Sequence, residues 1–477
     1  MDTTASLDAL PTASWGELFS GRNGLMAVAL TGGVALHAIN VHIVTTVLPS
    51  VVREIGGLDW YAWNTTLFVV ASIVGAALAS RLLAGGGPRG ACLAALALFA
   101  LGSVGCAAAQ SMPWMLGARA VQGLGGGLLA ALSYALIRVV FAPPLWPRAV
   151  ALVSGMWGVA TLCGPAVGGL FAEAGHWRWA FWSLLPVALA QALLVLVQLR
   201  PRADAAEAGA VPGIPFVQIG LLAASVLAVA AGSLSPLLPL QALGVALGLA
   251  LGAAALVWDR RASVRLLPSG GASLATALGA VYACVALLLA GTTTEIFVPY
   301  FLQVLHGQSP LVAGYLTAAM AGGWSLGSLL SSGRSGGDAA RLLRGGPVLC
   351  VFGLLALAGL IPLAGELDYG LRTLLVGLAL AAVGAGVGIG WPHLLTRVLE
   401  LAPRGEENAA STAITTVQLY GMAVGAALAG LVANAAGLSV PGGVAGAQSA
   451  AIWLFAGFAL APLLAALLAR RVIGGAH

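Results

Sequence analysis

The sequence predicts an all-α protein that crosses a membrane many times. Of its 477 residues, 60% are hydrophobic and only 8% are charged, and the mean hydropathy is +0.99. A helix needs about 20 apolar residues to cross a hydrocarbon core of ~30 Å. Fourteen stretches of that kind are predicted, at residues 24–48, 61–83, 91–110, 113–137, 149–172, 178–199, 214–233, 236–257, 273–302, 310–332, 346–364, 373–396, 409–434 and 448–469.

The placement of arginine supports this count and predicts the orientation. All 21 basic residues are Arg, and short cytoplasmic loops collect basic residues. Only Arg53, Arg178 and Arg372 fall on the outer side, Arg119 lies inside a span, and the other 17 fall on the opposite side. Both termini are therefore expected in the cytoplasm of a bacterium, with the chain in the inner membrane. The net charge of +5 follows from this asymmetry, so membrane lipids, and not nucleic acids, are expected partners.

Polar breaks in the hydrophobic pattern divide the chain into two bundles with a hairpin between them. The polar string at 200–207 ends the first six spans, and Asp259-Arg-Arg261 follows two spans with almost no polar side chains. An inserted pair of spans leaves the orientation of the second set of six unchanged, so the two sets can rock about a central site. The expected divisions are an N-terminal cytoplasmic segment (1–23), a six-helix bundle (24–200), a linker (201–213), a transmembrane hairpin (214–258), a second linker (259–272), a second six-helix bundle (273–470) and a cytoplasmic tail (471–477).

Two charges lie deep inside predicted spans, Arg119 in the fourth and Glu295 in the ninth. A charge at membrane depth costs roughly 2.5 to 3.5 kcal/mol, so each is expected to have a function or a partner. At about 1.5 Å per residue, both lie roughly 10 Å below the outer ends of their spans. They are therefore predicted to share one level in the membrane.

Glycine-rich strings in the fourth and fifth spans predict close helix packing. In the fourth span, Arg119, Gln122 and Gly126 share one helical face because they are three and seven residues apart. The fifth span carries a stripe of small residues around a proline that bends the helix and frees a carbonyl. The members of this stripe are Gly155, Gly158, Gly164, Pro165, Gly168 and Gly169.

Together these strings resemble the fourteen-helix drug:proton antiporter branch of the major facilitator superfamily. The match comprises Arg-x-x-Gln-Gly at 119–123, Gly-Pro-x-x-Gly-Gly at 164–169 and Trp-Arg-Trp-Ala-Phe at 177–181, with weaker matches at 48–49 and 418–425. The resemblance implies two six-helix bundles, alternating access and proton-driven export of lipophilic compounds. It also implies that spans one, four, nine and twelve line a cavity, so that Arg119 and Glu295 face it from opposite bundles.

The sequence departs from the family pattern at two places. Asn40 stands where the family usually has an acid in the first span, which leaves Glu295 as the only carboxylate predicted within the membrane. In the loop after the second span, Ser80 stands where the family has Asp, and Arg81 and Arg89 follow it. Without that acid the cytoplasmic gate is expected to close in another way, for example through Arg81 bonded to carbonyls at a helix end.

Glu295 is therefore the expected proton-coupling acid, which takes a proton from outside and releases it inward as substrate leaves. Arg119 is expected either to bridge to Glu295 when the outer side is closed or to separate from it when that side is open. Two simpler roles for Arg119 remain: a permanent ion pair with Glu295, or hydrogen bonds to carbonyls of a neighbouring broken helix. His37 and His42 in the first span are candidates for a proton relay or for hydrogen-bonded packing.

Other polar and aromatic side chains are expected to line the substrate cavity. Aromatic rings stack on flat or cationic compounds, and a carboxylate favours cations or neutral molecules, although Arg119 leaves anions open. The candidates are Asn40, Gln122, Trp157, Tyr300, Trp324 and Gln418.

The sequence contains no nucleophile elbow, metal-binding string or phosphate loop. The chain is therefore expected to be no enzyme, to need no cofactor or metal, and to move small lipophilic substrates and protons as a monomer. Three alternatives stay open. They are an exporter of a lipid or a defined metabolite with the same fold, a non-transporting membrane sensor or assembly factor, and an intramembrane enzyme, which the single buried acid disfavours.

Overall fold

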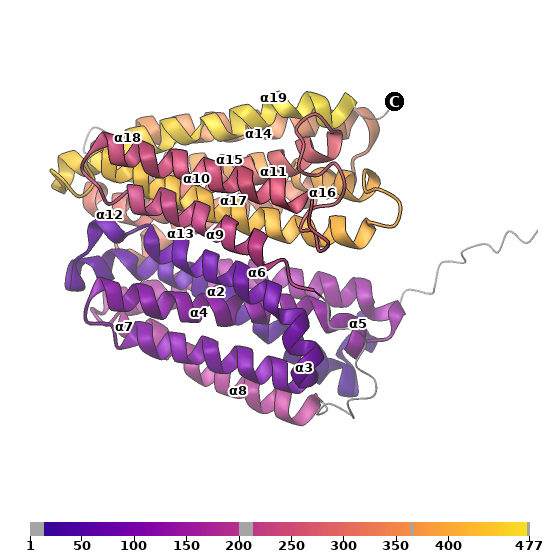
Figure 1. The fold of residues 1–477 in the computed structure, drawn as a ribbon. Coiled ribbons are helices and arrows are strands. Elements are labelled where there is room, and N and C mark those ends of the chain that lie inside the picture. Colours follow the sequence, from indigo (N-terminus) through magenta and orange to yellow (C-terminus); the bar gives the residue numbers. More distant parts are fainter. Residues whose placement is uncertain (1–13, 200–212, 364–366, 475–477) are drawn as a thin grey trace, which may run out of the picture.

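The computed structural model describes residues 14–199, 213–363 and 367–474, and within these ranges it contains long helices and no strand (Figure 1). Most of the predicted linker at 201–213 and parts of the predicted end segments at 1–23 and 471–477 lie outside the described residues. The helices of the N-terminal half are α1 (Trp15–Phe19), α2 (Gly21–Ile55), η1 (Leu58–Trp60), α3 (Trp63–Ala107), α4 (Met112–Ala135), α5 (Ile137–Val140), η2 (Pro143–Leu145), α6 (Trp146–Glu173), α7 (Arg178–Trp182) and α8 (Leu184–Gln198).

A helical hairpin separates this half from a second set of helices. The hairpin consists of α9 (Phe216–Gly232) and α10 (Leu238–Asp259). The helices of the C-terminal half are α11 (Ala277–Thr292), η4 (Thr293–Phe297), α12 (Val298–His306), α13 (Pro310–Ser331), α14 (Gly336–Leu360), α15 (Tyr369–Gly388), α16 (Trp391–Glu400), α17 (Glu407–Ala435), α18 (Gly443–Phe458) and α19 (Leu460–Gly474).

The long helices run side by side, so the molecule has two ends (Figure 1). We call the end where α2 begins and α19 finishes the terminal end; α5 and α16 lie there, at the right of Figure 1. The opposite end, with α7 and α12 at the left of the view, is the distal end. The arginine pattern predicts that the terminal end faces the cytoplasm and the distal end the outside.

Eleven helical segments in the described part of the chain are long and apolar enough to cross a membrane. One of them, Leu58–Ala107, is 50 residues long and contains the non-helical residue Gly87 (φ 66°) before Pro88. Proline disfavours helical backbone at the preceding residue, and glycine adopts a positive φ without strain. The all-α, membrane-spanning class is confirmed, whereas the count of fourteen spans stays a prediction.

The largest differences between predicted and observed boundaries are in the first and eleventh spans. The first span does not end at residue 48, because α2 continues through Pro49 to Ile55; prolines are tolerated in membrane helices whose neighbours satisfy the freed backbone groups. The eleventh span begins at Gly336 and not at 346. Its first turns carry Arg341 and Arg344, and hydropathy marks only the apolar part of such a helix.

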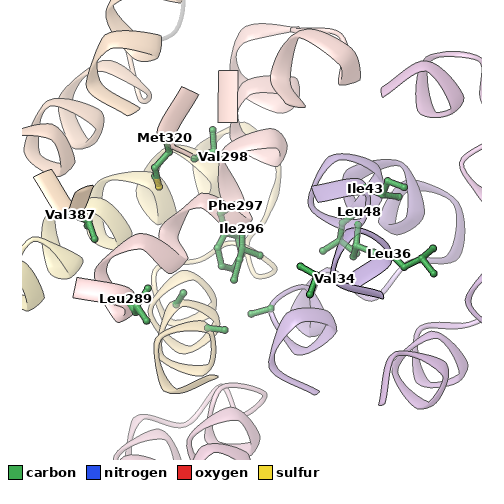
Figure 2. Packing of buried hydrophobic residues seen from close by; sticks show 14 of the residues in the cluster. Val34, Leu36, Ile43, Leu48, Leu289, Ile296, Phe297, Val298, Met320 and Val387 are labelled. Carbon is green, nitrogen blue, oxygen red and sulfur yellow. The ribbon is translucent and has the colours of Figure 1, made fainter. Parts of the chain in front are cut away.

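Buried apolar side chains fill both halves of the molecule (Figure 2). α2 supplies one set of them in this view, and the C-terminal half supplies the other. The labelled residues are Val34, Leu36, Ile43 and Leu48 in the first set and Leu289, Ile296, Phe297, Val298, Met320 and Val387 in the second.

Glycines bring the backbones of α3 and α4 into contact. A Cβ atom added to Gly123 would lie 2.2 Å from the carbonyl oxygen of Phe68, and one added to Gly127 would lie 2.2 Å from that of Ser72. Only glycine permits so close an approach. This packing fixes α4, and with it Arg119, directly beside α3.

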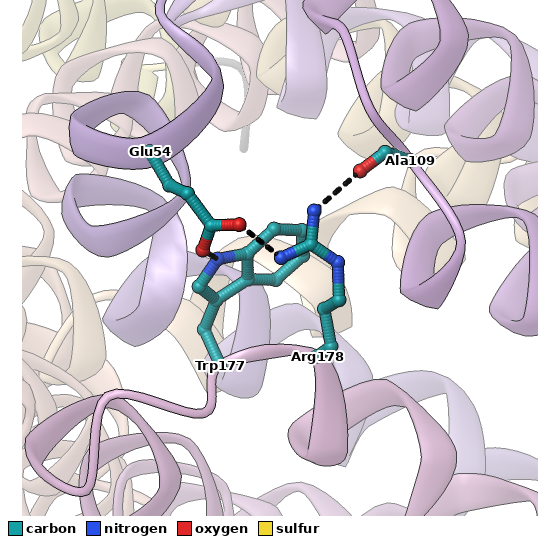
Figure 3. A network of polar contacts seen from close by, with 4 residues as sticks. All are labelled: Glu54, Ala109, Trp177 and Arg178. Carbon is teal, nitrogen blue, oxygen red and sulfur yellow. Dashed lines mark hydrogen bonds and ion pairs between the residues drawn. The ribbon is translucent and has the colours of Figure 1, made fainter.

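A polar cluster at the distal end joins three parts of the N-terminal half (Figure 3). Glu54 near the end of α2 accepts a hydrogen bond of 2.6 Å from the Trp177 indole and another from the Arg178 guanidinium. Arg178 also donates to the carbonyl of Ala109 at 2.8 Å. Because the charged side chains are partly exposed, the ion pair itself contributes only about 0.2–1 kcal/mol, and the cluster mainly orients α7.

Candidate functional site

A cavity of about 1240 Å³ lies between the two halves. Pockets for drug-sized ligands occupy roughly 300–1,000 Å³, so this volume admits molecules of varied shape. Arg119 and Glu295 both line it, and the wall continues to Ser80, Arg265 and Ser411, which are exposed at the terminal end. The cavity therefore communicates with the terminal face of the molecule.

Aromatic side chains close the distal end. Tyr61 from the N-terminal half stacks on Phe297 with 5.0 Å between ring centroids and meets the edge of Tyr300 at 5.6 Å. Tyr61 and Phe297 are 1% and 0% exposed, so no opening passes between them. The structure thus represents a conformation with the terminal side open and the distal side closed.

Glu295 lies where its span is broken, which corrects the prediction of a continuous helix at 273–302. The segment Thr293–Phe297 is a 3₁₀ turn between α11 and α12. Pro299 explains the break, because its ring clashes with the carbonyl four residues earlier, that of Glu295, and it has no N–H to donate. Short 3₁₀ stretches within a helix often mark a hinge.

The carboxylate of Glu295 has no hydrogen-bond or ion-pair partner in the part of the chain that the structure describes. Three threonines precede it, and the hydroxyls of Thr292, Thr293 and Thr294 all bond back to carbonyls of α11. Such back-bonding leaves these hydroxyls engaged within their own helix and bends it. Glu295 is consequently a free acid on the wall of the cavity.

Arg119 is held by its own half of the molecule. Its Nε donates to the carbonyl of Asn64 at 3.2 Å, its Nη1 donates to Gln122, and its guanidinium carbon lies 4.1 Å above the Phe68 ring. Gln122 in turn donates to Ser103 at 2.9 Å. Arg119 is 2% exposed, so these two hydrogen bonds and the Phe68 ring are the contacts that hold a deeply buried cation.

No ion pair joins Arg119 to Glu295 among the described residues, although the distal end is closed. The expectation that the two bridge in such a conformation is wrong here, and so is a permanent pair. Arg119 instead donates a hydrogen bond to a backbone carbonyl, which was the other simple role expected for it. The carbonyl is that of Asn64, at the start of α3. The physical reason is that the carbonyl and the Gln122 amide lie within reach on the same bundle.

His37 and Trp157 form an aromatic surface on the N-terminal wall. The His37 ring stacks on Phe68 at 5.3 Å and meets the edge of Trp157 at 5.9 Å, and all three residues line the cavity. His37 Nδ1 has no hydrogen-bond partner and faces α4, since a Cβ added to Gly126 would lie 2.6 Å from it. His37 is thus packed against α4 with its ring at the edge of the cavity.

The other predicted site residues, including Ser80 of the gate loop and the proton-relay candidate His42, fall into two groups. Gln418 and Ser80 line the cavity with Trp157 and His37. The second group does not line it. Asn40 is fully buried, and neither of its side-chain polar atoms has a hydrogen-bond partner. His42 packs against α6, and Gln122 accepts a hydrogen bond from Arg119. Tyr300 belongs to the distal closure, and the Trp324 ring meets the edge of Trp391 at 4.8 Å.

The glycine stripe of the fifth span lies in α6, where α6 contacts α2 and α13. A Cβ added to Gly164 would lie 2.3 Å from the Cβ of His42, and one added to Gly169 would lie 2.6 Å from the Cα of Leu311 in the other half. Gly168 faces Ile43 and Thr46 in the same way, and Pro165 approaches Gly314. Gly155, in contrast, has nothing within 4 Å. The distal part of the stripe is therefore the part that joins the halves.

The predicted gate loop makes no closing contact in this conformation. Ser80 lines the cavity, and Arg81 is exposed. Neither Arg81 nor Arg89 forms a hydrogen bond or ion pair with any described residue, so the expected bonds from Arg81 to helix-end carbonyls are not made. This agrees with a terminal side that is open.

Sequence reasoning missed several hydroxyl residues of the cavity. No sequence pattern marks these residues as cavity-lining, because single Ser and Thr residues are common in membrane helices and bond to their own backbone. Arg265 was assigned only to a cytoplasmic linker. The missed polar residues are Thr45, Thr65, Ser72, Tyr134, Arg265, Thr292, Thr293, Ser411, Thr412, Thr415 and Thr416.

Comparisons with known proteins agree with this architecture. Residues 30–426 match the family model described as Major Facilitator Superfamily. A protein of Mycobacterium tuberculosis named "Probable multidrug-efflux transporter" is 38% identical over 435 residues, which cover 90% of this chain and 91% of that protein. "Multidrug resistance protein 3" of Bacillus subtilis is 24% identical, over 85% of this chain and 79% of that protein.

Solved structures share the fold at low sequence identity. A POT family transporter in complex with 5-aminolevulinic acid gives a TM-score of 0.68 at 13% identity and covers 97% of this chain and 99% of its own. A bacterial homologue of the human lysosomal transporter Spinster gives 0.63 at 17% identity, over 95% and 98%. With a family model that matches most of its length, this chain belongs to the major facilitator superfamily.

Proposed function

We propose that the protein is a proton-coupled exporter of lipophilic cationic or neutral compounds that works by alternating access. The observation that carries the proposal is Glu295, an acid without a partner on the wall of a large cavity between two halves. The two relatives described above, one named a probable multidrug-efflux transporter and the other a multidrug resistance protein, support export of this kind.

The geometry supports a simple exchange of substrate for proton at Glu295. A bare carboxylate in a low-dielectric cavity is costly unless something neutralises it. A cationic substrate entering from the terminal side, or a proton arriving from the distal side, meets that need in alternation. The same 3₁₀ turn carries Phe297, which stacks on Tyr61. A change in the charge of Glu295 therefore occurs two residues from the aromatic contact that closes the distal end.

The aromatic surface supports a preference for flat, lipophilic molecules. Trp157 and Phe68 line the cavity on the wall opposite the C-terminal half, and aromatic faces attract cations as well as apolar rings. Two hydrogen bonds hold the Nε and Nη1 groups of Arg119 to its own bundle. Within the described part of the chain, three charged residues line the cavity, Arg119, Arg265 and Glu295. The two arginines have hydrogen-bond partners, whereas Glu295 has none among the described residues, which favours cations over anions.

The proposal includes the topology of fourteen spans, with the terminal end and both termini in the cytoplasm of a bacterium. The non-helical Gly87 divides Leu58–Ala107 into two segments, and the helices Phe216–Gly232 and Pro310–Ser331 are not among the eleven segments that are both long and apolar enough to cross a membrane. Counting these gives fourteen helical crossings, arranged as six, two and six. The arginine asymmetry of the sequence supports the orientation.

The test replaces Glu295 with Gln, which keeps the shape of the side chain but cannot carry the proton. In proteoliposomes, substrate-triggered proton movement and uphill efflux should be lost, while expression and fold stay intact. Glu400→Gln is the matched control, because Glu400 is an exposed acid that pairs with Arg397 at the terminal end. Full coupled transport by Glu295→Gln would overturn the assignment.

A panel of compounds separates the proposed cargo from the alternatives. Proton release triggered by several unrelated lipophilic cations indicates a multidrug exporter, whereas release triggered only by a lipid or one metabolite indicates a dedicated exporter. A protein that moves no protons with any compound is a sensor or assembly factor.

A further inference from the structure

The α9–α10 hairpin and the linker at 259–272 form one wall of the central cavity. Ile219 of α9 and the linker residues Val264, Arg265 and Leu266 line it. α9 packs against α3 of the N-terminal half and α17 of the C-terminal half. The inserted hairpin therefore covers the seam between the two halves on this side of the molecule.

The contact between the hairpin and the N-terminal half is apolar. No hydrogen bond joins residues 213–272 to residues 14–199 where the structure describes them. Apolar contacts have no preferred direction, so two such surfaces can slide past each other at small cost. The buried members of this contact are Phe68, Val69, Val70 and Ile73 on α3 and Ile219, Val226, Val229 and Ala230 on α9.

The contact with the C-terminal half is polar and occurs at three levels. At the distal end Asn434 donates to the carbonyl of Ser233 at 3.1 Å, and near the middle the hydroxyls of Ser225 and Tyr420 lie 3.0 Å apart. At the terminal end Glu406 accepts from the N–H of Ser269 at 2.6 Å and from its hydroxyl at 2.7 Å. Hydrogen bonds are directional, so these three fix the hairpin relative to α17.

The hairpin and its linker also form a single unit. Asp259, which is 3% exposed, accepts from the backbone N–H groups of Leu266 and Leu267 at 2.6 and 3.1 Å and from Gln218 at 3.2 Å. Gln218 donates further to the carbonyl of Val264 at 2.8 Å. A carboxylate with three donors is well satisfied, so the linker follows any movement of α9.

From this asymmetry we infer that the hairpin and linker move with the C-terminal half and slide over α3 during transport. They keep the cavity closed to lipid along the α3–α17 seam in every conformation. The inference rests on the proposed function, because it concerns the change between two conformations. Asn434 also donates to the carbonyl of Asp59 in the N-terminal half at 2.8 Å, and this bond, unlike the one to Ser233, breaks when the distal end opens.

Two cysteine pairs test the inference in a variant whose five native cysteines are replaced. The pair Ser225→Cys with Tyr420→Cys joins the hairpin to α17, and the pair Val69→Cys with Val226→Cys joins it to α3. A short bifunctional thiol reagent that a reducing agent reverses links each pair in proteoliposomes. The first link should leave efflux of a lipophilic cation unchanged, and the second should reduce it at least tenfold until the link is reduced.

Loss of transport in the linked Ser225–Tyr420 pair, or full transport in the linked Val69–Val226 pair, would overturn the inference. If the unlinked variants fold but do not transport while the wild type does, the substitutions have disabled transport and the movement is tested separately; if the wild type also moves no substrate, the proposed function fails. Spin labels at the same four positions then report distances at high and low pH. The Ser225–Tyr420 distance should stay constant while the Val69–Val226 distance changes, and the reverse pattern contradicts the inference.

Discussion

At the scale of single residues, the two charges predicted within the membrane, Arg119 and Glu295, differ in their hydrogen-bond partners. Spacing along the helices predicted their level, and both line one cavity. The partner of Arg119 was not predictable, because a guanidinium accepts any nearby oxygen and the Asn64 carbonyl is 55 residues away in sequence. Glu295 has no partner among the described residues, and for that reason we propose it as the charge that acts in transport.

Removing the Arg119 side chain should destabilise the fold before it affects coupling. Arg119→Ala removes the hydrogen bonds from the guanidinium to the Asn64 carbonyl and to the Gln122 side-chain oxygen, and a hydrogen bond to a charged group contributes about 1.5–3 kcal/mol. Thermal unfolding in detergent should therefore show a clearly lower midpoint. Arg81→Ala is the control, because Arg81 is exposed; equal midpoints for the two variants would show that the Arg119 bonds carry no stability.

At the scale of helices, hydropathy located the spans but not their breaks. The predicted span at 273–302 is interrupted by the 3₁₀ turn at Thr293–Phe297, although Pro299 was visible in the sequence. Apolar content is equally high in straight and broken helices, so only the backbone chemistry of proline distinguishes them. The packing role of the α6 glycines was predictable as a pattern, whereas the helices that they contact were not.

Two glycines of α6 offer a matched comparison of packing. Gly164→Ala places a methyl group where His42 Cβ lies 2.3 Å away, whereas Gly155→Ala meets nothing within 4 Å. Overpacking of a tight contact costs about 1–3 kcal/mol, so only the first variant should lower the unfolding midpoint and the transport rate. A Gly155→Ala protein that loses as much stability as Gly164→Ala would contradict this assignment of the glycine stripe.

At the scale of the whole molecule, the inserted hairpin lies against both halves (Figure 1). Its two helices were predicted from an apolar stretch with few polar side chains, which lies between two sets of six predicted spans. Its position over α3 and α17 was not predictable, because an apolar surface does not specify which of several grooves it covers. The polar side chains that hold the hairpin unit against the C-terminal half, including Tyr420 and Glu406, are distant in sequence from their partners Ser225 and Ser269.

The terminal contact of this hairpin unit should depend on pH. The hydrogen bonds from Ser269 hold the pKa of Glu406 below its usual range, which is about 4.3 for a free Glu. For a carboxyl whose pKa is lowered in the folded state, the stabilisation is present above the unfolded pKa and is lost as pH falls through the lower folded value. Near neutral pH the contact is therefore complete, and it weakens only below about pH 4.

Hydrogen exchange at the Ser269 amide measures this contact directly. After correction for the intrinsic pH dependence of exchange, protection of the linker peptide should fall below about pH 4 in the wild type. In Glu406→Gln the amide has no carboxylate acceptor at any pH, so protection should be lower at neutral pH and independent of acidification. Wild-type protection that persists unchanged through acid pH, or a Glu406→Gln variant as protected as wild type at pH 7, would show that other contacts hold the linker on α17.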